Sequence, residues 1–162
     1  KPVWGISTAD FHEDGRLGQK LGAFPTTFLV KSFTKSSILE AMKEGRMFCS
    51  RGDGENWPQF DYLFVTGGPG EKAFMGETLI TGQYPVIQFK VSHRVEKQGR
   101  MTLLLIRGGR VIHTWEGKTP MEVKYVDREI ENGRETFYRV MDSRKLLISN
   151  PLFVKYGPDE NK

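Results

Sequence analysis

The stretch Met101-Thr102-Leu103-Leu104-Leu105-Ile106-Arg107-Gly108-Gly109-Arg110-Val111-Ile112-His113-Thr114-Trp115 decides the fold class of this chain. Two apolar runs flank Arg107-Gly108-Gly109-Arg110, and glycines between such runs are a strong signal for a β-hairpin. The first run, residues 101–106, is almost continuously apolar, so we expect a central strand that is covered on both faces. The stretch therefore predicts antiparallel pairing in a sheet.

Further short strands are predicted on both sides of this hairpin, with glycine, proline or asparagine turns between them. A second hairpin is expected across Asn132-Gly133, between residues 123–129 and residues 136–140. Regularly spaced short strands of this kind are typical of an antiparallel β-sandwich. We therefore expect a mainly β fold with a sandwich over residues 46–156, followed by a disordered tail at residues 157–162.

One α-helix is predicted over residues 35–44. Thr34 can cap its first turn, or Ser37 can do so together with Glu40 as a capping box. Gly45 follows in the position where a left-handed residue often ends a helix. The expected buried stripe consists of Ile38, Leu39, Ala41 and Met42.

Composition limits the class of protein without naming a function. A chain of 162 residues fits one domain, and its net charge of +4 includes no basic block, so nucleic acid is an unlikely partner. The single cysteine, Cys49, cannot form an internal disulfide and fits a small buried residue. We find no signal peptide and no apolar run near the roughly 20 residues of a membrane span, so we expect a cytoplasmic protein without a membrane partner.

The first residues contain the only neighbouring side chains that look like metal ligands, in Asp10-Phe11-His12. Residues two apart on a strand point to the same face, so this carboxylate and imidazole can converge on one cation. The two ligand types suit zinc, manganese or iron. By spacing alone, a surface aspartate beside a packed histidine is the favoured interpretation, because a zinc site needs about three or four protein ligands.

Several motifs in order resemble the end of a PHP domain, the polymerase and histidinol phosphatase family, and the β domain that follows it in one bacterial branch. The segments that carry the resemblance are Asp10-Phe11-His12, residues 34–50 (TKSSILEAMKEGRMFCS), Met75-Gly76-Glu77, Phe137-Tyr138-Arg139-Val140 and residues 149–154 (SNPLFV). The resemblance implies a metal-dependent phosphoesterase with a distorted βα barrel. In that family divalent metals orient phosphate and activate water, and Asp10 and His12 match two of the metal ligands.

The same resemblance implies that most of the catalytic domain is missing from this chain. The family's early His-x-His motif and its middle ligands have no match here, so residues 1–45 would be the last strand, loop and helix of a barrel that is deleted or lies upstream. We therefore expect an incomplete Asp10–His12 site, no bound metal in this chain, no catalytic residues of its own and no phosphoester hydrolysis by the chain alone. The helix should leave an apolar patch where the barrel would pack, and a second copy in a homodimer could cover it.

A stand-alone binding module for carbohydrate or protein is the alternative. Its candidate residues are the aromatic side chains of Trp4, Trp57, Trp115 and Tyr62. Core packing is the competing explanation for each of them, and Trp57-Pro58 in a polar loop is the one we expect to be exposed. A purely structural role of residues 51–162, in stabilising the barrel or in assembly, is the third interpretation. We assign none of Arg51, Arg107, Arg110 and Arg139 to a substrate.

Overall fold

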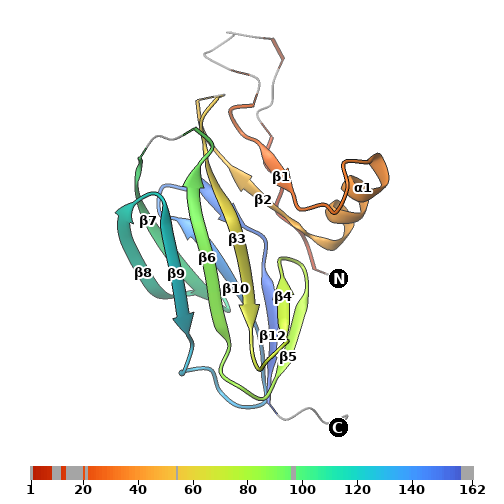
Figure 1. The fold of residues 1–162 in the computed structure, drawn as a ribbon, viewed down its shortest axis with the longest axis vertical. Coiled ribbons are helices and arrows are strands. Elements are labelled where there is room, and N and C mark those ends of the chain that lie inside the picture. Colours follow the sequence, from red (N-terminus) through yellow and green to blue (C-terminus); the bar gives the residue numbers. More distant parts are fainter. Residues whose placement is uncertain are drawn as a thin grey trace.

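The computed structural model describes residues 2–8, 12–13, 20, 22–53, 55–95 and 98–157. Within these residues the fold is mainly β, as predicted, with twelve strands and a single helix (Figure 1). The strands and the helix are β1 (Thr26–Phe28), α1 (Lys35–Glu44), β2 (Met47–Ser50), β3 (Pro58–Thr66), β4 (Lys72–Phe74), β5 (Thr78–Thr81), β6 (Val86–His93), β7 (Arg100–Arg107), β8 (Arg110–Lys118), β9 (Met121–Val126), β10 (Arg134–Asp142), β11 (Leu147–Ser149) and β12 (Leu152–Tyr156).

The strands form two sheets that face each other. The larger sheet has the order β1-β2-β11-β10-β12-β5, and β7 pairs with β10 and carries β8 at its other side. The smaller sheet has the order β4-β3-β6-β9 and lies in front of the larger one in Figure 1. All pairings are antiparallel except that of β5 with β12, which is parallel. The predicted sandwich is therefore confirmed at the level of two largely antiparallel sheets.

The core fills the space between the sheets because side chains along each strand alternate between the core and the solvent. The smaller sheet buries Val65, Ile87, Phe89 and Val91, and the larger one buries Leu103, Leu105, Tyr138 and Val140.

The hairpin of β7 and β8 is confirmed, with Gly108 and Gly109 both at positive φ in its turn. Strand β7 is central, but its predicted burial on both faces is wrong, since every second residue is only half-buried.

The second predicted hairpin is wrong. Strand β9 pairs with β6 in the smaller sheet, whereas β10 pairs with β7, β11 and β12 in the larger one. The chain crosses between the sheets after β9 because two side chains of the connection, Asp127 and Ile130, are buried. Asn132-Gly133 forms only the turn that leads into β10, and Gly133 donates its amide hydrogen to the Tyr156 carbonyl at 2.7 Å.

Asp127 links the two sheets through a fully buried carboxylate. Nη1 of Arg107, on β7, lies 2.8 and 2.7 Å from its two oxygens. The Tyr138 hydroxyl, on β10, donates to Oδ2 at 2.6 Å, and the Glu129 amide donates to Oδ1 at 3.0 Å. Burial, followed by the hydrogen bond to Asp127, raises the pKa of Tyr138, so this hydroxyl keeps its proton as the donor. Because its partners satisfy the carboxylate, Asp127 is a structural link between the sheets.

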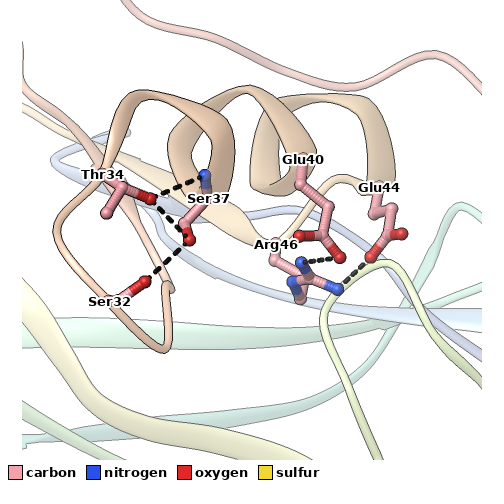
Figure 2. A network of polar contacts seen from close by, with 6 residues as sticks. All are labelled: Ser32, Thr34, Ser37, Glu40, Glu44 and Arg46. Carbon is pink, nitrogen blue, oxygen red and sulfur yellow. Dashed lines mark hydrogen bonds and ion pairs between the residues drawn. The ribbon is translucent and has the colours of Figure 1, made fainter.

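Helix α1 begins and ends where the sequence predicts. The Thr34 hydroxyl accepts a hydrogen bond from the Ser37 amide, and Ser32 and Ser37 extend this cap through their hydroxyls (Figure 2). The predicted cap by Thr34 is thus the one that forms. Gly45 ends the helix with φ of 75° and donates to the Ala41 carbonyl. No helix in the described part of the chain is long and apolar enough to cross a membrane.

Candidate functional site

The structure describes only one of the two predicted metal ligands. Asp10 lies outside the described residues, and His12 lies inside them with an exposed side chain. Among the residues that are described, no group of three or more histidine, cysteine, aspartate or glutamate side chains gathers in a way that could hold a metal ion. The pairing of Asp10 with His12 therefore stays a prediction.

Five exposed large apolar side chains lie in the N-terminal segment, in helix α1 and in the residues before the helix. Val3 is 86% exposed, Phe33 93%, Leu39 54% and Met42 38%, and Ile6 is exposed as well. The N-terminal segment and α1 lie on the same side of the sandwich (Figure 1). We call these five side chains the N-terminal apolar surface. Large exposed apolar side chains are ordinary when scattered, but several on one side of a small domain are typical of an interaction surface.

The helix contributes to this surface because its predicted buried stripe is only partly covered. Ala41 is fully buried and Ile38 is half-buried, so this edge of α1 faces the body of the protein. Leu39 and Met42 lie three positions apart on one helix face, and both are exposed. The expectation that these two residues would be buried is therefore wrong for this chain. Leu39 and Met42 give the helix an exposed apolar edge, and the packing of a barrel on it stays a prediction.

The N-terminal segment is fixed to the sandwich by a tryptophan and an asparagine. The indole Nε1 of Trp4 donates to the Lys43 carbonyl at 2.9 Å, and its ring meets Phe153 of β12 edge to face at 6.1 Å. Asn150, which is 2% exposed, accepts from the Gly5 amide at 2.8 Å and donates to the Gly5 carbonyl at 3.3 Å. This paired contact holds the segment in the manner of a strand neighbour.

The end of α1 is fixed by two glycines. A Cβ on Gly45 would lie 2.5 Å from the Trp4 ring, so only glycine lets the indole close over the helix end. Gly76, in the turn between β4 and β5, has φ of 85°, and a Cβ there would lie 1.8 Å from the Glu44 carbonyl oxygen. Arg46 forms ion pairs with Glu40 and Glu44 beside this joint (Figure 2). The apolar surface therefore sits on a firmly held part of the fold.

Three of the aromatic residues considered for ligand binding, Trp57, Trp115 and Tyr62, already contact other side chains of the protein. The Arg94 guanidinium covers the Trp57 ring at 4.6 Å, and Trp57 is half-buried, which does not agree with its predicted exposure. Trp115 packs edge to face on the core residue Phe89 at 5.4 Å, as core packing predicts. Tyr62 is also half-buried, and its hydroxyl donates to Glu122 at 2.7 Å. Trp4 is half-buried as well, so none of the four aromatic residues considered for the binding module is fully exposed.

The arginines that were left without a substrate role have different surroundings. Arg107 is tied to Asp127, and Arg51 lies over the Phe24 ring at 5.3 Å. The side chain of Arg110 forms no ion pair or hydrogen bond within the described ranges, although its backbone pairs with that of Arg107. Arg139 has a buried Nε without a hydrogen-bond partner among the described atoms. Cys49 is a half-buried residue of β2.

A serine, a histidine and an aspartate meet at one end of the smaller sheet. Ser92 donates to Asp61 at 2.5 Å, whereas the His93 Nδ1 pairs with the Thr119 hydroxyl at 2.8 Å. Nucleophilic catalysis requires the base to bond the nucleophile, and here the carboxylate bonds the serine while the imidazole bonds the threonine. Burial, with a smaller effect of Arg144, lowers the pKa of His93. This arrangement does not form a catalytic relay.

Sequence reasoning missed Asp127 and Asn150, the two polar residues that fix the sheets and the N-terminal segment. Asn150 lay within Ser149-Asn150-Pro151, which has the composition of a simple turn. Only the three-dimensional contact with Gly5 gives it a role. Comparisons with protein family models, with curated proteins and with solved structures found no match to this chain.

Proposed function

We propose that this chain is the C-terminal accessory domain of a PHP-type metal-dependent phosphoesterase and is not catalytic alone. The proposal rests on the order of the motifs in the sequence and on one structural observation. That observation is the N-terminal apolar surface, which adjoins the Asp10-Phe11-His12 motif in the chain and is held to the sandwich by Trp4 and Asn150. A catalytic barrel that packs on this surface would bury it.

The expected gain from such packing is large for a few side chains. Full burial of one large apolar side chain contributes about 1.5–3 kcal/mol. Phe33, Leu39 and Met42 expose much of their surface, so covering them would stabilise a domain interface. The fixed joint at Gly45 and Gly76 would let the sandwich hold α1 in place against the barrel. This is the structural role that we propose for the sandwich.

The donor set of Asp10 and His12 fits a divalent zinc, manganese or iron ion, because a carboxylate and an imidazole are common ligands of all three. Such an ion, when bound, lowers the pKa of a coordinated water and orients a phosphate group. Two ligands leave much of the coordination shell to other groups, which the proposal assigns to the barrel. Asp10 and His12 would then hold one side of the metal from the accessory chain.

Hydrolysis of bis(p-nitrophenyl) phosphate with added Mn²⁺ or Zn²⁺ tests the proposal. The isolated chain should show no turnover, and the full-length gene product should show turnover that Asp10→Ala abolishes. Asp14→Ala is the matched control, a nearby carboxylate outside the motif, and should keep the activity. Turnover by the isolated chain that depends on Asp10 would overturn the accessory role, and an inactive full-length product would overturn the phosphoesterase.

A further inference from the structure

The smaller sheet has an outer face, which carries the residues of β3 and β6 that alternate with the buried core residues. The strand register places Phe74, Phe64, Gln88 and Lys124 in one row across the sheet. Tyr62, Lys90 and Glu122 form the next row. Residues opposite each other in paired strands share a face, so both rows point away from the core. We call these two rows, with Lys72, the outer face.

Three aromatic rings of the outer face form a continuous strip. The Tyr62 and Phe64 rings are 5.5 Å apart with a tilt of 33°, and Phe64 meets Phe74 edge to face at 6.1 Å. Phe74 is 38% exposed, and Tyr62 and Phe64 are half-buried. Aromatic rings held at a surface in this way offer flat apolar contact at low cost in conformational entropy.

The charges on the outer face are unequally paired. Lys72 lies 3.6 Å from the centre of the Phe64 ring, and neither it nor Lys90 nor Lys124 forms an ion pair within the described residues. The two carboxylates bond hydroxyl groups instead, since Glu122 accepts from Tyr62 and Asp61 accepts from Ser92. Three ammonium groups without carboxylate partners make this face complementary to an anionic ligand.

An open pocket of about 490 Å³ with both polar and apolar lining lies beside Lys90, past the Tyr62 end of the aromatic strip. Lys90 belongs both to the outer face and to the wall of the pocket, which Asp61, Ser92 and Gln98 also line. A carboxylate, a hydroxyl, an ammonium and an amide together can accept and donate hydrogen bonds on several sides of one group. The pocket therefore suits a polyhydroxylated ring, and the strip suits the rings that follow it.

We propose that the outer face binds an acidic oligosaccharide, a chain of sugars that includes uronic acid residues. Lys72 also lies 4.9 Å from the centre of the Phe74 ring, which leaves Tyr62 as the ring of the strip without an ammonium group over it among the described residues. Sugar rings pack their C–H faces on Tyr62, hydroxyl groups donate to Asp61 and Glu122, and the uronate carboxylates pair with Lys90 and Lys124. This inference does not depend on the proposed phosphoesterase. It replaces the tryptophans of the predicted binding module with a set of residues on one face of the sheet.

Single-stranded nucleic acid is the other anionic polymer that combines rings with charge, and the same observations favour it less. Nucleic-acid binding requires open ring faces for stacked bases and a groove that tracks the phosphates. The Lys72 ammonium covers the Phe64 ring, and two carboxylates stand within or beside the face where phosphates would run. Those carboxylates can accept hydrogen bonds from the several hydroxyl groups of each sugar, whereas the backbone of a DNA strand presents no hydroxyl donors to them.

Isothermal titration calorimetry of this chain with an oligogalacturonate tests the inference. A neutral cello-oligosaccharide of equal length and an oligothymidylate serve as comparison ligands. The oligogalacturonate should bind best, Tyr62→Ala should weaken it by about tenfold or more, and Lys90→Ala should weaken it by several-fold and reduce its dependence on salt. Tyr84→Ala and Lys118→Ala are the matched controls, because both residues are exposed and lie off the outer face.

Each other outcome counts against the inference. Absence of oligogalacturonate binding, equal binding of the neutral oligomer, tighter binding of the oligothymidylate, or equal losses in the control variants would each overturn it. Chemical shift perturbation can be measured on the unaltered protein, so this second test does not require that any variant folds. Oligogalacturonate should shift the amide signals of β3 and β6 around Tyr62 and Lys90, and shifts confined to other strands would contradict the assigned site.

Discussion

Asp127 shows how one residue fixes the path of the chain between the two sheets. Removing its carboxylate leaves the Arg107 guanidinium and the Tyr138 hydroxyl without their partner. Breaking a buried ion pair on one side costs about 3–5 kcal/mol, so Asp127→Ala should lower the free energy of unfolding by that order, as measured by urea denaturation. Glu131→Ala is the matched control, because its pair with Arg134 spans 3.8 Å between side chains that are 79% and 66% exposed. It should change stability by at most about 1 kcal/mol, and equal losses in the two variants would refute the structural link.

His93 makes the stability of the protein depend on pH. Its pKa in the folded protein lies below the ordinary value of 6.5, chiefly because burial disfavours the charged ring. The folded state therefore binds this proton less readily than the unfolded state, and the contribution is present above about pH 6.5 and is lost as the pH falls through the lowered pKa. Urea denaturation between pH 7.5 and 5.5 should show stability falling toward acid, and His93→Gln should make the fall smaller. An identical pH dependence in the variant would contradict this role.

At the scale of elements, the joint between α1 and the turn after β4 depends on Gly76. A Cβ there would meet the Glu44 carbonyl oxygen at 1.8 Å, in addition to the strain of φ at 85°. Gly109, at the tip of the β7–β8 hairpin, has nearly the same φ of 88° and has no atom within 4 Å of an added Cβ. Gly109→Ala should therefore cost only the strain of the backbone, about 1 kcal/mol, and Gly76→Ala should cost clearly more. Equal thermal unfolding temperatures for the two variants would show that the close approach at Gly76 is not real.

The elements that the sequence predicts correctly are those set by neighbours in the chain. The caps at Thr34 and Gly45 delimit α1, and Gly108-Gly109 defines the β7–β8 hairpin, since each depends on local backbone geometry. The partner of β9 was not predictable, because it depends on the capture of Asp127 by residues of the other sheet. The outer face was also missed. Its rows contain residues of four strands whose register is known only from the fold.

The exposure of Leu39 and Met42 could also not be predicted, because it depends on contacts between distant parts of the chain. An amphipathic pattern shows that a helix face prefers to be covered, but it does not show what covers it. In this chain Ala41 faces the sandwich, and the other two side chains remain at the surface. The Asp10-Phe11-His12 motif has the same limit as a predictor. A pair of ligands becomes a metal site only when other groups complete the coordination shell, and the motif does not show which groups those are.

At the scale of the whole molecule, the N-terminal apolar surface should also affect association of the isolated chain. A second copy is the alternative cover for Phe33 and Leu39, so concentrated samples should self-associate in sedimentation velocity experiments. The double variant Phe33→Ser and Leu39→Ser should reduce this association without unfolding the protein, because both side chains are exposed. Val111→Ser, an exposed apolar residue at the far hairpin of β8, is the control and should leave association unchanged. Association that resists the double variant would place the interface elsewhere.

Hydrogen–deuterium exchange most directly tests the proposal that a barrel docks on the N-terminal apolar surface. Amides of α1 and of the segment around Phe33 should exchange more slowly in the full-length gene product than in the isolated chain. Amides of β8, on the opposite side of the sandwich, should exchange alike in both (Figure 1). Equal exchange of α1 in the two proteins would contradict the claim that this chain is an accessory domain docked through that surface.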